Sequence, residues 1–379
     1  MWKTASILVT IVLVLITLGV VMLASTSSIQ GDQLFKDPNY FLKRQLLWLV
    51  VGFLAAFMTS NIDYHYWKPL ALPLALFSVI LLVMVLIPGV GLNIKGSSRW
   101  LRFGSANFQP SELAKLATVI FLAWWMSRVQ RHALELVRGL VIPLGGLGLI
   151  LGLIFIEPDF GTTMLIGVVG MTLMFVGGSR ISYLVVAAAA GLCGFTLAIM
   201  QDAERMRRVT AFLNPEKYAK DEAFQLLNAI YAFVVGGGGG VGLGQSLQKH
   251  FYLPEAHTDF IFAILGEELG LTASLSVVVL FIGLFICGTR ISFRAQDQFG
   301  KLLGFGLTMM IVVQAAINIG VVTGSLPTKE LPLPFISFGG SSLMVSLAMI
   351  GVLINIARQS GDETETDESR CIKDAAHRI

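Results

Sequence analysis

The sequence has 379 residues, of which 55% are hydrophobic and only 13% are charged, and its formal net charge at pH 7 is +3. Soluble globular chains carry about 25% charged residues, so this composition excludes a soluble domain and indicates an integral membrane protein. The small net charge also gives no reason to expect nucleic acid as a partner.

Apolar runs of about 20 residues, the length needed to cross a membrane, recur along the whole chain. They predict spans at roughly 6–27, 44–60, 67–88, 111–127, 139–157, 162–178, 183–201, 259–288, 301–323 and 337–357. The predicted fold class is therefore all-α, a polytopic integral membrane protein with about ten transmembrane helices. Residues 1–357 form a single transmembrane domain with one long loop at about 202–258, and the polar residues 358–379 form a disordered tail.

The distribution of Lys and Arg indicates which side of the membrane the termini face. With an even number of spans both termini lie on one side, which receives 13 of the 27 Lys and Arg residues, while the other side receives 14. Six of those 14 lie in the 202–258 loop, and charges in so long a loop have little influence on orientation. The remaining 13 against 8 favour cytoplasmic termini and an external long loop.

If the termini are cytoplasmic, the external loops are unusually basic, and Arg205 and Arg208 lie in the longest of them. The arginine side chain suits the geometry of phosphate groups, so these residues are candidates for binding an anionic ligand. Contact with lipid headgroups at the membrane surface explains them equally well.

Two short charged motifs lie next to predicted spans. Glu112 and Lys115 follow a helix start at Gln109-Pro-Ser, and their spacing of three places them on one helix face. Glu157 and Asp159 flank a proline between two apolar runs. Both motifs fit a polar cavity at membrane depth. A structural ion pair at the first motif, and a solvated interfacial turn at the second, fit as well.

Two segments rich in glycine or proline interrupt the apolar pattern. The glycine run 236–244 contains a G-x-G-x-x-G spacing but belongs to no βαβ unit, so it does not indicate a nucleotide site. Flexible backbone that hinges or approaches a ligand is the better interpretation. Residues 331–342 break the chain before the last span, and their N–H groups and serines either receive an anion or cap the helix that follows.

The strongest functional signal is the stretch 252–270, in which a polar segment runs straight into an apolar helix. It carries four carboxylates and a histidine: Glu255, His257, Asp259, Glu267 and Glu268. Ionisable side chains at a hydrocarbon boundary are costly. Each of these residues therefore needs a partner, a wet cavity or a catalytic role.

Together these motifs resemble the SEDS family, the shape, elongation, division and sporulation polymerases of bacterial cell-wall synthesis. The resemblance runs in order from about residue 6 to residue 357, and it is closer to the division-type members than to the elongation-type members. It rests on the blocks Arg99-Trp100, Gln109–Lys115, Glu157–Gly161, Phe212–Pro215, Tyr252–Phe262, Gly266–Gly270 and Leu331–Ser342.

The resemblance implies a SEDS-like fold of ten helices in the bacterial cytoplasmic (inner) membrane, with both termini cytoplasmic. It also implies a peptidoglycan glycosyltransferase that polymerises lipid II on the outer face, in cell division or elongation. The implied partners are a class B penicillin-binding protein and other membrane proteins of the divisome or elongasome. The essential acid of the family falls on Asp259, and its cavity residues fall on Trp100, Glu112, Lys115 and Asp159. To these candidate substrate contacts we add His257, Arg205 and Arg208.

The chemistry of chain extension fits these residue types. A sugar 4-hydroxyl attacks an anomeric carbon whose leaving group is a lipid diphosphate, and a carboxylate such as Asp259 takes the hydroxyl proton. Cations must offset the charge that gathers on the diphosphate, and Lys115 is one candidate. No cofactor is certain; a divalent ion, Mg²⁺ or Mn²⁺, would find hard oxygen ligands in Asp159 or Asp259.

Two alternatives belong to other functional classes. A lipid II flippase would also use polar intramembrane groups and broken spans, whereas a non-enzymatic divisome scaffold would leave Asp259 unexplained. The position of the charged groups distinguishes the glycosyltransferase hypothesis from the flippase hypothesis. Catalysis requires Asp259 at the external mouth of the bundle, but transport requires a charged path that reaches both faces.

Overall fold

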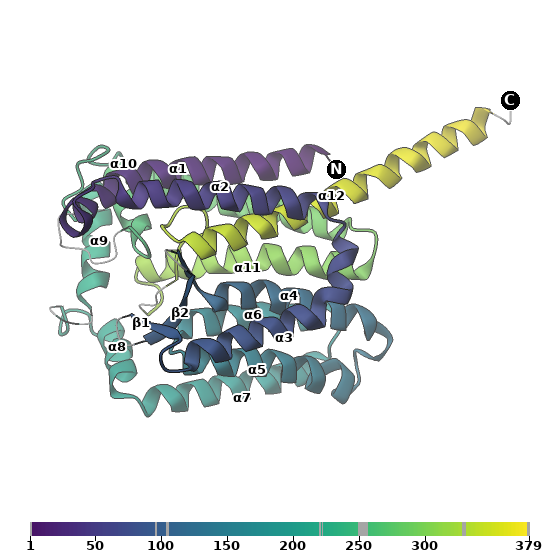
Figure 1. The fold of residues 1–379 in the computed structure, drawn as a ribbon, viewed down its shortest axis with the longest axis horizontal. Helices are drawn as coiled ribbons and strands as arrows, with labels where there is room; N and C mark the ends of the chain where they lie inside the picture. The colour runs from purple at the N-terminus through teal and green to yellow at the C-terminus, as the bar shows by residue number, and fades with distance from the viewer. Residues whose placement is uncertain are drawn as a thin grey trace.

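The structure is a computed structural model that describes residues 2–94, 97–103, 106–219, 221, 223–248, 257–327 and 331–376. Within these residues ten long helices run side by side (Figure 1). The first five are α1 (Trp2–Phe35), α2 (Tyr40–Asn61), α3 (Trp67–Leu86), α4 (Pro110–Arg128) and α5 (Ile142–Ile156). The others are α6 (Phe160–Val176), α7 (Ile181–Met200), α10 (Ile261–Phe293), α11 (Gln298–Val322) and α12 (Gly340–Ala376).

The prediction of an all-α bundle of about ten transmembrane helices is confirmed. Eight of the helices are long and apolar enough to cross a membrane by themselves. The remaining two are α6, which has 17 residues, and α4, which begins with the charged residues Glu112 and Lys115. Both lie parallel to the other helices in Figure 1. Packing within the bundle therefore accommodates the short length of α6 and the charged residues of α4.

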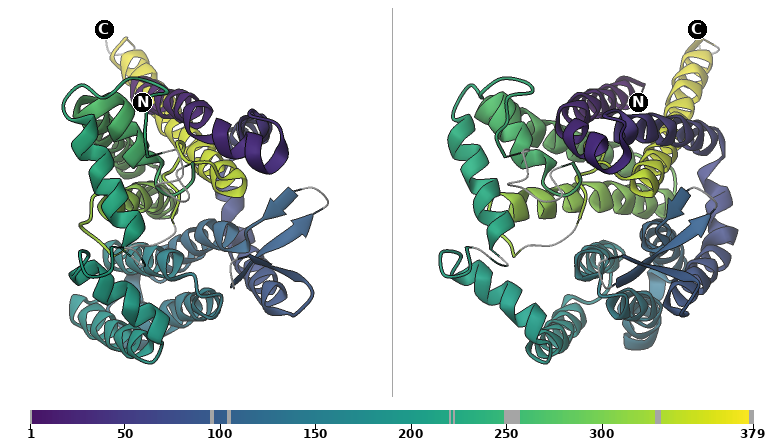
Figure 2. Two further views of the ribbon diagram at one scale, coloured as in Figure 1. Left: turned by 90° about the vertical axis from the view of Figure 1, so that its left-hand side faces the viewer. Right: turned by 60° about the vertical axis from the view of Figure 1, so that its left-hand side comes forward.

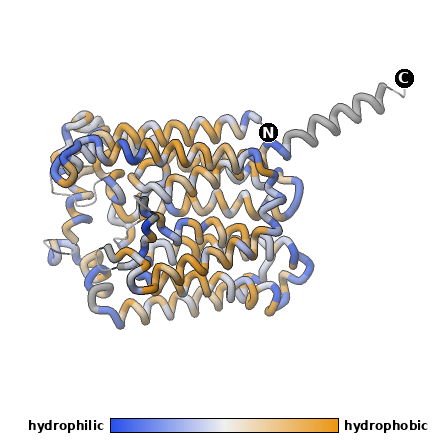
Figure 3. Tube along the Cα trace, viewed as in Figure 1, coloured by the Kyte–Doolittle hydropathy of each residue, from blue (hydrophilic) through white to orange (hydrophobic). Residues whose placement is uncertain are grey.

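Hydrophobic residues predominate along the helices, and polar residues gather at the two ends of the bundle (Figure 3). One end holds both termini and the turns that join α2 to α3 and α10 to α11. α7 lies at the margin of the bundle, and Leu184 is the one buried residue along its length. Because most of its other apolar side chains, such as Val185, Val186 and Leu192, are exposed, α7 presents a lipid-facing surface.

The second helix, α2, and the last helix, α12, pack closely through small residues. A Cβ added at Gly351 of α12 would overlap Thr59 and Ala56 of α2. The Thr59 hydroxyl also donates a hydrogen bond to the Ala348 carbonyl at 3.0 Å. Small residues let helix backbones approach in a membrane, where lipid offers no hydrophobic drive for association.

The segment between α3 and α4, expected only as a loop, contains a three-stranded antiparallel sheet. Its strands are β1 (Gly91–Ile94), β2 (Ser97–Phe103) and β3 (Ala106–Phe108), in the order β1-β2-β3. Leu101 of β2 is buried in a small cluster with Leu81 and Val85 of α3. This contact fixes the sheet against the end of the bundle opposite the termini, where it projects in Figure 2.

The long 202–258 loop contains two helices, α8 (Ala203–Leu213) and α9 (Phe224–Gly236). α8 begins only a few residues after α7 ends, so its chain connection keeps it at the end of that span. In Figure 1 both helices run across the ends of the spans, on the same side of the bundle as the sheet. Its apolar residues Met206, Val209 and Leu213 recur at helical spacing between polar residues, so α8 is amphipathic, as expected of a helix at a membrane surface.

The glycine run 236–244 packs against a break in α10. Gly270 has φ +77°, outside the helical region, so α10 is interrupted there. The run inserts beside the interruption, where Val241 N–H donates to the Glu267 carbonyl and Leu271 N–H donates to the Gly237 carbonyl. The close approach expected of this run is therefore made to the backbone of α10.

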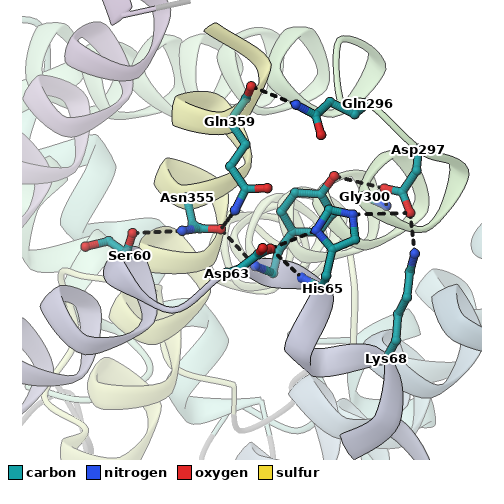
Figure 4. Close-up of polar contacts among 10 residues, drawn as sticks. Ser60, Asp63, His65, Lys68, Gln296, Asp297, Gly300, Asn355 and Gln359 are labelled. Atoms are coloured by element: carbon teal, nitrogen blue, oxygen red, sulfur yellow. Dashed lines mark hydrogen bonds and ion pairs between the residues drawn. The ribbon is translucent and has the colours of Figure 1, made fainter. Parts of the chain in front are cut away.

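The terminal end of the bundle holds a polar cluster that joins the α2–α3 turn and the α10–α11 turn to α12 (Figure 4). Asp297, the N-cap of α11, accepts hydrogen bonds from Lys68 Nζ at 2.5 Å and from the Tyr64 hydroxyl at 2.9 Å. Burial alone would raise the pKa of Asp297, but hydrogen bonds from Lys68, the Gly300 amide and Tyr64 hold it below its ordinary value. On α12, Asn355 donates to the Ser60 carbonyl at 3.0 Å.

The backbone of α12 continues through Ala376, past the expected start of the tail at residue 358. In Figure 1 this extension projects away from the bundle. A helix without packing neighbours is marginally stable in water, so a disordered tail at 358–379 stays a prediction about the chain in solution.

Gly270 gives a test of the α10 break. Because a side chain disfavours positive φ by about 1–2 kcal/mol, and a Cβ there would overlap the Gly240 amide, Gly270→Ala should lower the midpoint of thermal unfolding in detergent. Gly148→Ala in α5, where an added Cβ meets nothing within 4 Å, is the matched control and should stabilise the helix slightly, by about 0.5–1 kcal/mol. Equal midpoints for the two variants would contradict this account of the break.

Candidate functional site

Asp259 lies in the turn His257–Phe260 that leads into α10, at the end of the bundle that also holds the sheet. The sequence predicts a helix that begins at this residue with Thr258 as its cap, but α10 begins at Ile261 and Phe260 is its N-cap. Asp259 therefore precedes the helix and is partly exposed. The side-chain amide of Asn318, on α11, donates to the Asp259 backbone carbonyl at 2.8 Å.

The loop 331–340 packs against this turn from inside the bundle, and we call it the floor loop. Leu331, Leu333, Phe335 and Ile336 are each at most 3% exposed, so the loop lies inside the bundle. Its Phe338 N–H donates to the His257 carbonyl at 3.0 Å.

The imidazole of His257 is buried between the rings of Phe41 and Phe338, with its centroid 4.6 Å and 5.9 Å from theirs. The predicted substrate contact His257 is thus packed among aromatic rings and forms part of the wall of the site.

A buried ion pair lies beside the floor loop. Lys115 Nζ is 2.6 Å from Glu112 Oε2 and donates to Gln314 Oε1 at 2.8 Å. Lys115 is 1% exposed and Glu112 is 2% exposed, so both charges are shielded from solvent. A lysine ammonium has three hydrogens, and these two partners leave one for a further acceptor.

The turn between α5 and α6 contributes two more buried carboxylates. Asp159 caps α6 by accepting from Thr162 N–H at 3.1 Å, and it also accepts from the Gln109 amide at 3.3 Å. Arg99 of β2 donates to the backbone carbonyls of Glu157 and Pro158 at 3.2 Å and 2.9 Å. The sheet therefore holds this turn in place through one guanidinium.

Glu157 is the exception to this satisfied network. It is 1% exposed, and neither of its carboxylate oxygens has a hydrogen-bond partner among the described residues. Burial, reinforced by the negative charge of Asp159, raises the pKa of Glu157 to about 8, although the Arg99 guanidinium opposes this. The side chain therefore carries a proton at neutral pH. The solvated carboxylate considered for this turn is wrong.

Glu267 and Glu268, the acids inside α10, tie the glycine-rich segment to the bundle. Glu267 accepts from the Ser246 hydroxyl and from Leu247 N–H, the latter at 2.9 Å. Glu268 accepts from the Ser25 hydroxyl of α1 at 2.7 Å. Both glutamates are at most 1% exposed, so they serve as anchors for the segment that precedes the Asp259 turn.

The remaining predicted substrate contacts, on the sheet and on α8, lie away from the Lys115–Glu112 ion pair. Strand alternation puts Trp100 of β2 on the face opposite Arg99 and Leu101, and no described hydrogen bond or ring contact joins it to the ion pair. Arg208 is exposed on α8. Arg205 belongs to the same helix, but its side chain lies outside the described residues, as does Glu255.

Sequence reasoning missed the two amides of α11 that connect these parts. Gln314 and Asn318 are four residues apart in an apolar helix, so they share one face. Polar residues inside a span are costly unless they have partners, and this spacing was the available signal. Glu157 was noticed as part of a turn, but its burial could not be read from the sequence.

A family model described as a cell cycle protein, FTSW_RODA_SPOVE, matches residues 5–362. A probable peptidoglycan glycosyltransferase FtsW of Trichlorobacter lovleyi is 40% identical over 351 residues, which cover 93% of this chain and 92% of that protein. The stage V sporulation protein E of Bacillus subtilis is 42% identical over 354 residues, covering 93% and 96%.

Two solved structures share the fold. A chain of a peptidoglycan synthase complex that coordinates polymerization and crosslinking aligns with a TM-score of 0.79 and 27% identity, covering 93% of this chain and 97% of that one. The rod shape determining protein RodA of Thermus thermophilus aligns with a TM-score of 0.69 and 26% identity, covering 93% and 96%.

Glu157 gives a pH test of the site. Because its pKa is raised in the folded chain, the folded state holds a proton that the unfolded state loses near pH 4.5. The free energy of unfolding should therefore fall, relative to Glu157→Gln, as pH rises to about 8, and the difference should be constant above that. Thermal unfolding of both proteins between about pH 6 and about pH 9 measures this. The exposed variant Glu216→Gln should keep the wild-type pH dependence. Parallel curves for wild type and Glu157→Gln would contradict the assignment.

Proposed function

Since the chain belongs to the family of cell cycle proteins that comprises FtsW, RodA and SpoVE, we infer that it is a peptidoglycan glycosyltransferase of the membrane, and we propose that it polymerises lipid II with Asp259 as the general base. One observation carries the proposal. Asp259 lies at the mouth of the bundle, and the buried ion pair of Lys115 and Glu112 lies beside the same floor loop.

The distribution of charge favours this reaction over transport. From Lys115 onward the buried residues of α4 are uncharged, and on α11 the described residues between Gln314 and the far end include buried Thr308 but no buried charge. The next charged cluster, around Asp297, lies at the opposite end of the bundle. A flippase would need a charged path through the interior, and the described residues contain none.

The proposed reaction forms one bond and breaks another at the same carbon. The 4-hydroxyl oxygen of one sugar bonds to the anomeric carbon of the next, and the bond from that carbon to the lipid diphosphate breaks. The hydroxyl proton passes to the Asp259 carboxylate, and the diphosphate leaves with the bonding electron pair. Such a base contributes about 10²–10⁴-fold in rate.

Lys115 is the proposed cation nearest this chemistry. Its charge is already paired with Glu112, so its contribution to the diphosphate is the one ammonium hydrogen that remains. The exposed Arg208 of α8, together with Arg205, is proposed to attract the anionic substrate at the membrane surface, where arginine suits phosphate. Trp100 and Asp159 stay proposed as cavity residues.

A divalent cation at this site remains a proposal on which no step depends. The described residues contain no group of three or more His, Cys, Asp or Glu side chains that could hold a metal. Both carboxylate oxygens of Asp159 already accept hydrogen bonds. Each of these oxygens keeps a second lone pair, so Asp159 stays a proposed oxygen ligand for Mg²⁺ or Mn²⁺ beside Asp259 and the substrate diphosphate.

The proposed setting is the bacterial cytoplasmic membrane, with both termini inside and the Asp259 end outside. A class B penicillin-binding protein is the proposed partner. This fits the structural relative that belongs to a complex coordinating polymerization and crosslinking. Other membrane proteins of the divisome are proposed on the likeness to FtsW.

Replacement of the proposed base gives the central test. Asp259→Asn keeps the shape of the side chain but cannot accept a proton at neutral pH, so glycan synthesis from lipid II should fall by at least about 10²-fold. Folded protein and binding to the class B partner should be unchanged. Asp221→Asn, an exposed acid in the same loop region, is the matched control and should polymerise normally. Near-normal glycan length from Asp259→Asn on a gel would remove Asp259 from the mechanism.

Cysteine labelling tests the orientation. In a variant without the native cysteines, Lys217→Cys, at an exposed position between α8 and α9, should react with a membrane-impermeant thiol reagent in intact cells. Arg131→Cys, exposed between α4 and α5, should react only after lysis. The reverse pattern would invert the proposed topology.

A further inference from the structure

Two amide side chains of α11 connect the Asp259 turn, the floor loop 331–340 and Lys115. The amide nitrogen of Asn318 donates to the Asp259 carbonyl at 2.8 Å and to the Leu331 carbonyl at 2.6 Å. One turn earlier, Gln314 accepts from Lys115 Nζ at 2.8 Å and donates to the Pro332 carbonyl at 2.8 Å. Three segments that are distant in the sequence therefore meet on one helix face.

The chemistry of these contacts requires an amide at both positions. Both partners of Asn318 are carbonyl oxygens, so its NH₂ group must face them, and its Oδ1 has no hydrogen-bond partner among the described residues. Gln314 must present its oxygen to an ammonium and its nitrogen to a carbonyl at the same time. At position 314 neither a carboxylate nor an apolar side chain of similar size offers both a donor and an acceptor, and at position 318 neither offers the two donors that the carbonyls need.

The spacing of the two amides along α11 sets the distance between the Asp259 turn and Lys115. Residues four apart on an α-helix lie about 6 Å apart along its axis. Asn318 holds the backbone of the proposed base, and Gln314 holds the proposed cation, so α11 fixes one relative to the other. Both amides are 2% exposed, which keeps water from competing for their hydrogen bonds.

We propose that Asn318 and Gln314 are positioning residues for the glycosyl transfer, because they hold the Asp259 backbone and the Lys115 ammonium at a fixed separation above the floor loop. The proposal rests on the function proposed above for Asp259. Reacting groups must be aligned closely, and a displacement of about 1 Å can cost about 10²-fold in rate. Loss of the Asn318 donors would release the Asp259 turn without removing any group that touches the substrate.

The experiment compares wild type, Asn318→Leu and Asn318→Asp as full-length protein with the class B partner and lipid II. Asn318→Asp keeps the shape but removes both donors. Both variants should lower kcat by about 10- to 100-fold while KM for lipid II stays within about twofold. Gln314→Glu, which keeps the acceptor for Lys115 and removes the donor to Pro332, should show a smaller loss of kcat.

The matched control is Asn355→Leu. Asn355 is also a buried asparagine that bridges backbone groups, since it donates to the Ser60 carbonyl and accepts from Tyr64 N–H at 2.9 Å (Figure 4). It lies beside the α2–α3 turn, at the end of the bundle that holds the termini (Figure 1). Asn355→Leu should lower the free energy of unfolding as Asn318→Leu does, yet leave kcat unchanged. An equal loss of kcat in Asn355→Leu would show that activity merely follows stability, and would overturn the proposal.

Hydrogen–deuterium exchange gives a readout that does not depend on activity. Amides in 257–262 and 331–338 should exchange about fivefold faster in the Asn318 variants, the factor expected for one lost hydrogen bond, and at the wild-type rate in Asn355→Leu. Unchanged exchange in both segments would overturn the proposal even if Asp259→Asn is inactive. If Asp259→Asn is active, the proposed base fails while the exchange result still decides whether Asn318 holds the turn. Loss of folded protein in both Asn318 variants would mean that the bonds support the fold itself, and would also overturn the positioning role.

Discussion

Irregular backbone buried inside a membrane protein must have its polar groups hydrogen-bonded by protein, because hydrocarbon offers no substitute. The floor loop 331–340 is such a backbone, and the rest of the site depends on how it is satisfied. Asn318 and Gln314 of α11 donate to its first two carbonyls, and Gln45 of α2 donates to the Ser337 carbonyl at 3.3 Å. The turn that carries Asp259 then rests on a surface fixed from two helices.

The charged side chains buried at this end of the bundle also need partners within the protein. Lys115 is paired, Glu267 and Glu268 accept hydrogen bonds from the glycine-rich segment and from α1, and Asp159 caps a helix. These acids therefore stabilise the scaffold around Asp259. Among the described residues Glu157 has no such donor. It stays neutral by holding a proton, because its pKa is raised to about 8, so its charge depends on pH near the physiological range.

The sequence predicted the spans well because apolar runs of membrane length report burial in lipid directly. Through the family resemblance it also singled out Asp259 as the essential acid and Lys115 and Asp159 as cavity residues, and these roles stay predictions. It could not show the sheet at 91–108, whose strands are short, or that Asp259 precedes α10. Hydropathy reports whether a residue is buried but not which partner it meets. The contacts of Asn318 with Asp259 and of Arg99 with the Glu157 turn, 59 and 58 residues apart, therefore appear only in the structure.

The close packing of α2 against α12 has a consequence for biogenesis. The ribosome delivers α2 near the beginning of synthesis and α12 at the end, so Gln45 enters the membrane long before the Ser337 carbonyl to which it donates. Thr59 also gains its bond to Ala348 late, although it already donates to the Ala55 carbonyl within α2. A nascent chain that ends after α11 already carries Asp259, Lys115 and Asp159, but it lacks the floor loop 331–340 against which the Asp259 turn packs. Insertion of the last span, with the loop that precedes it, is therefore the step that completes the site.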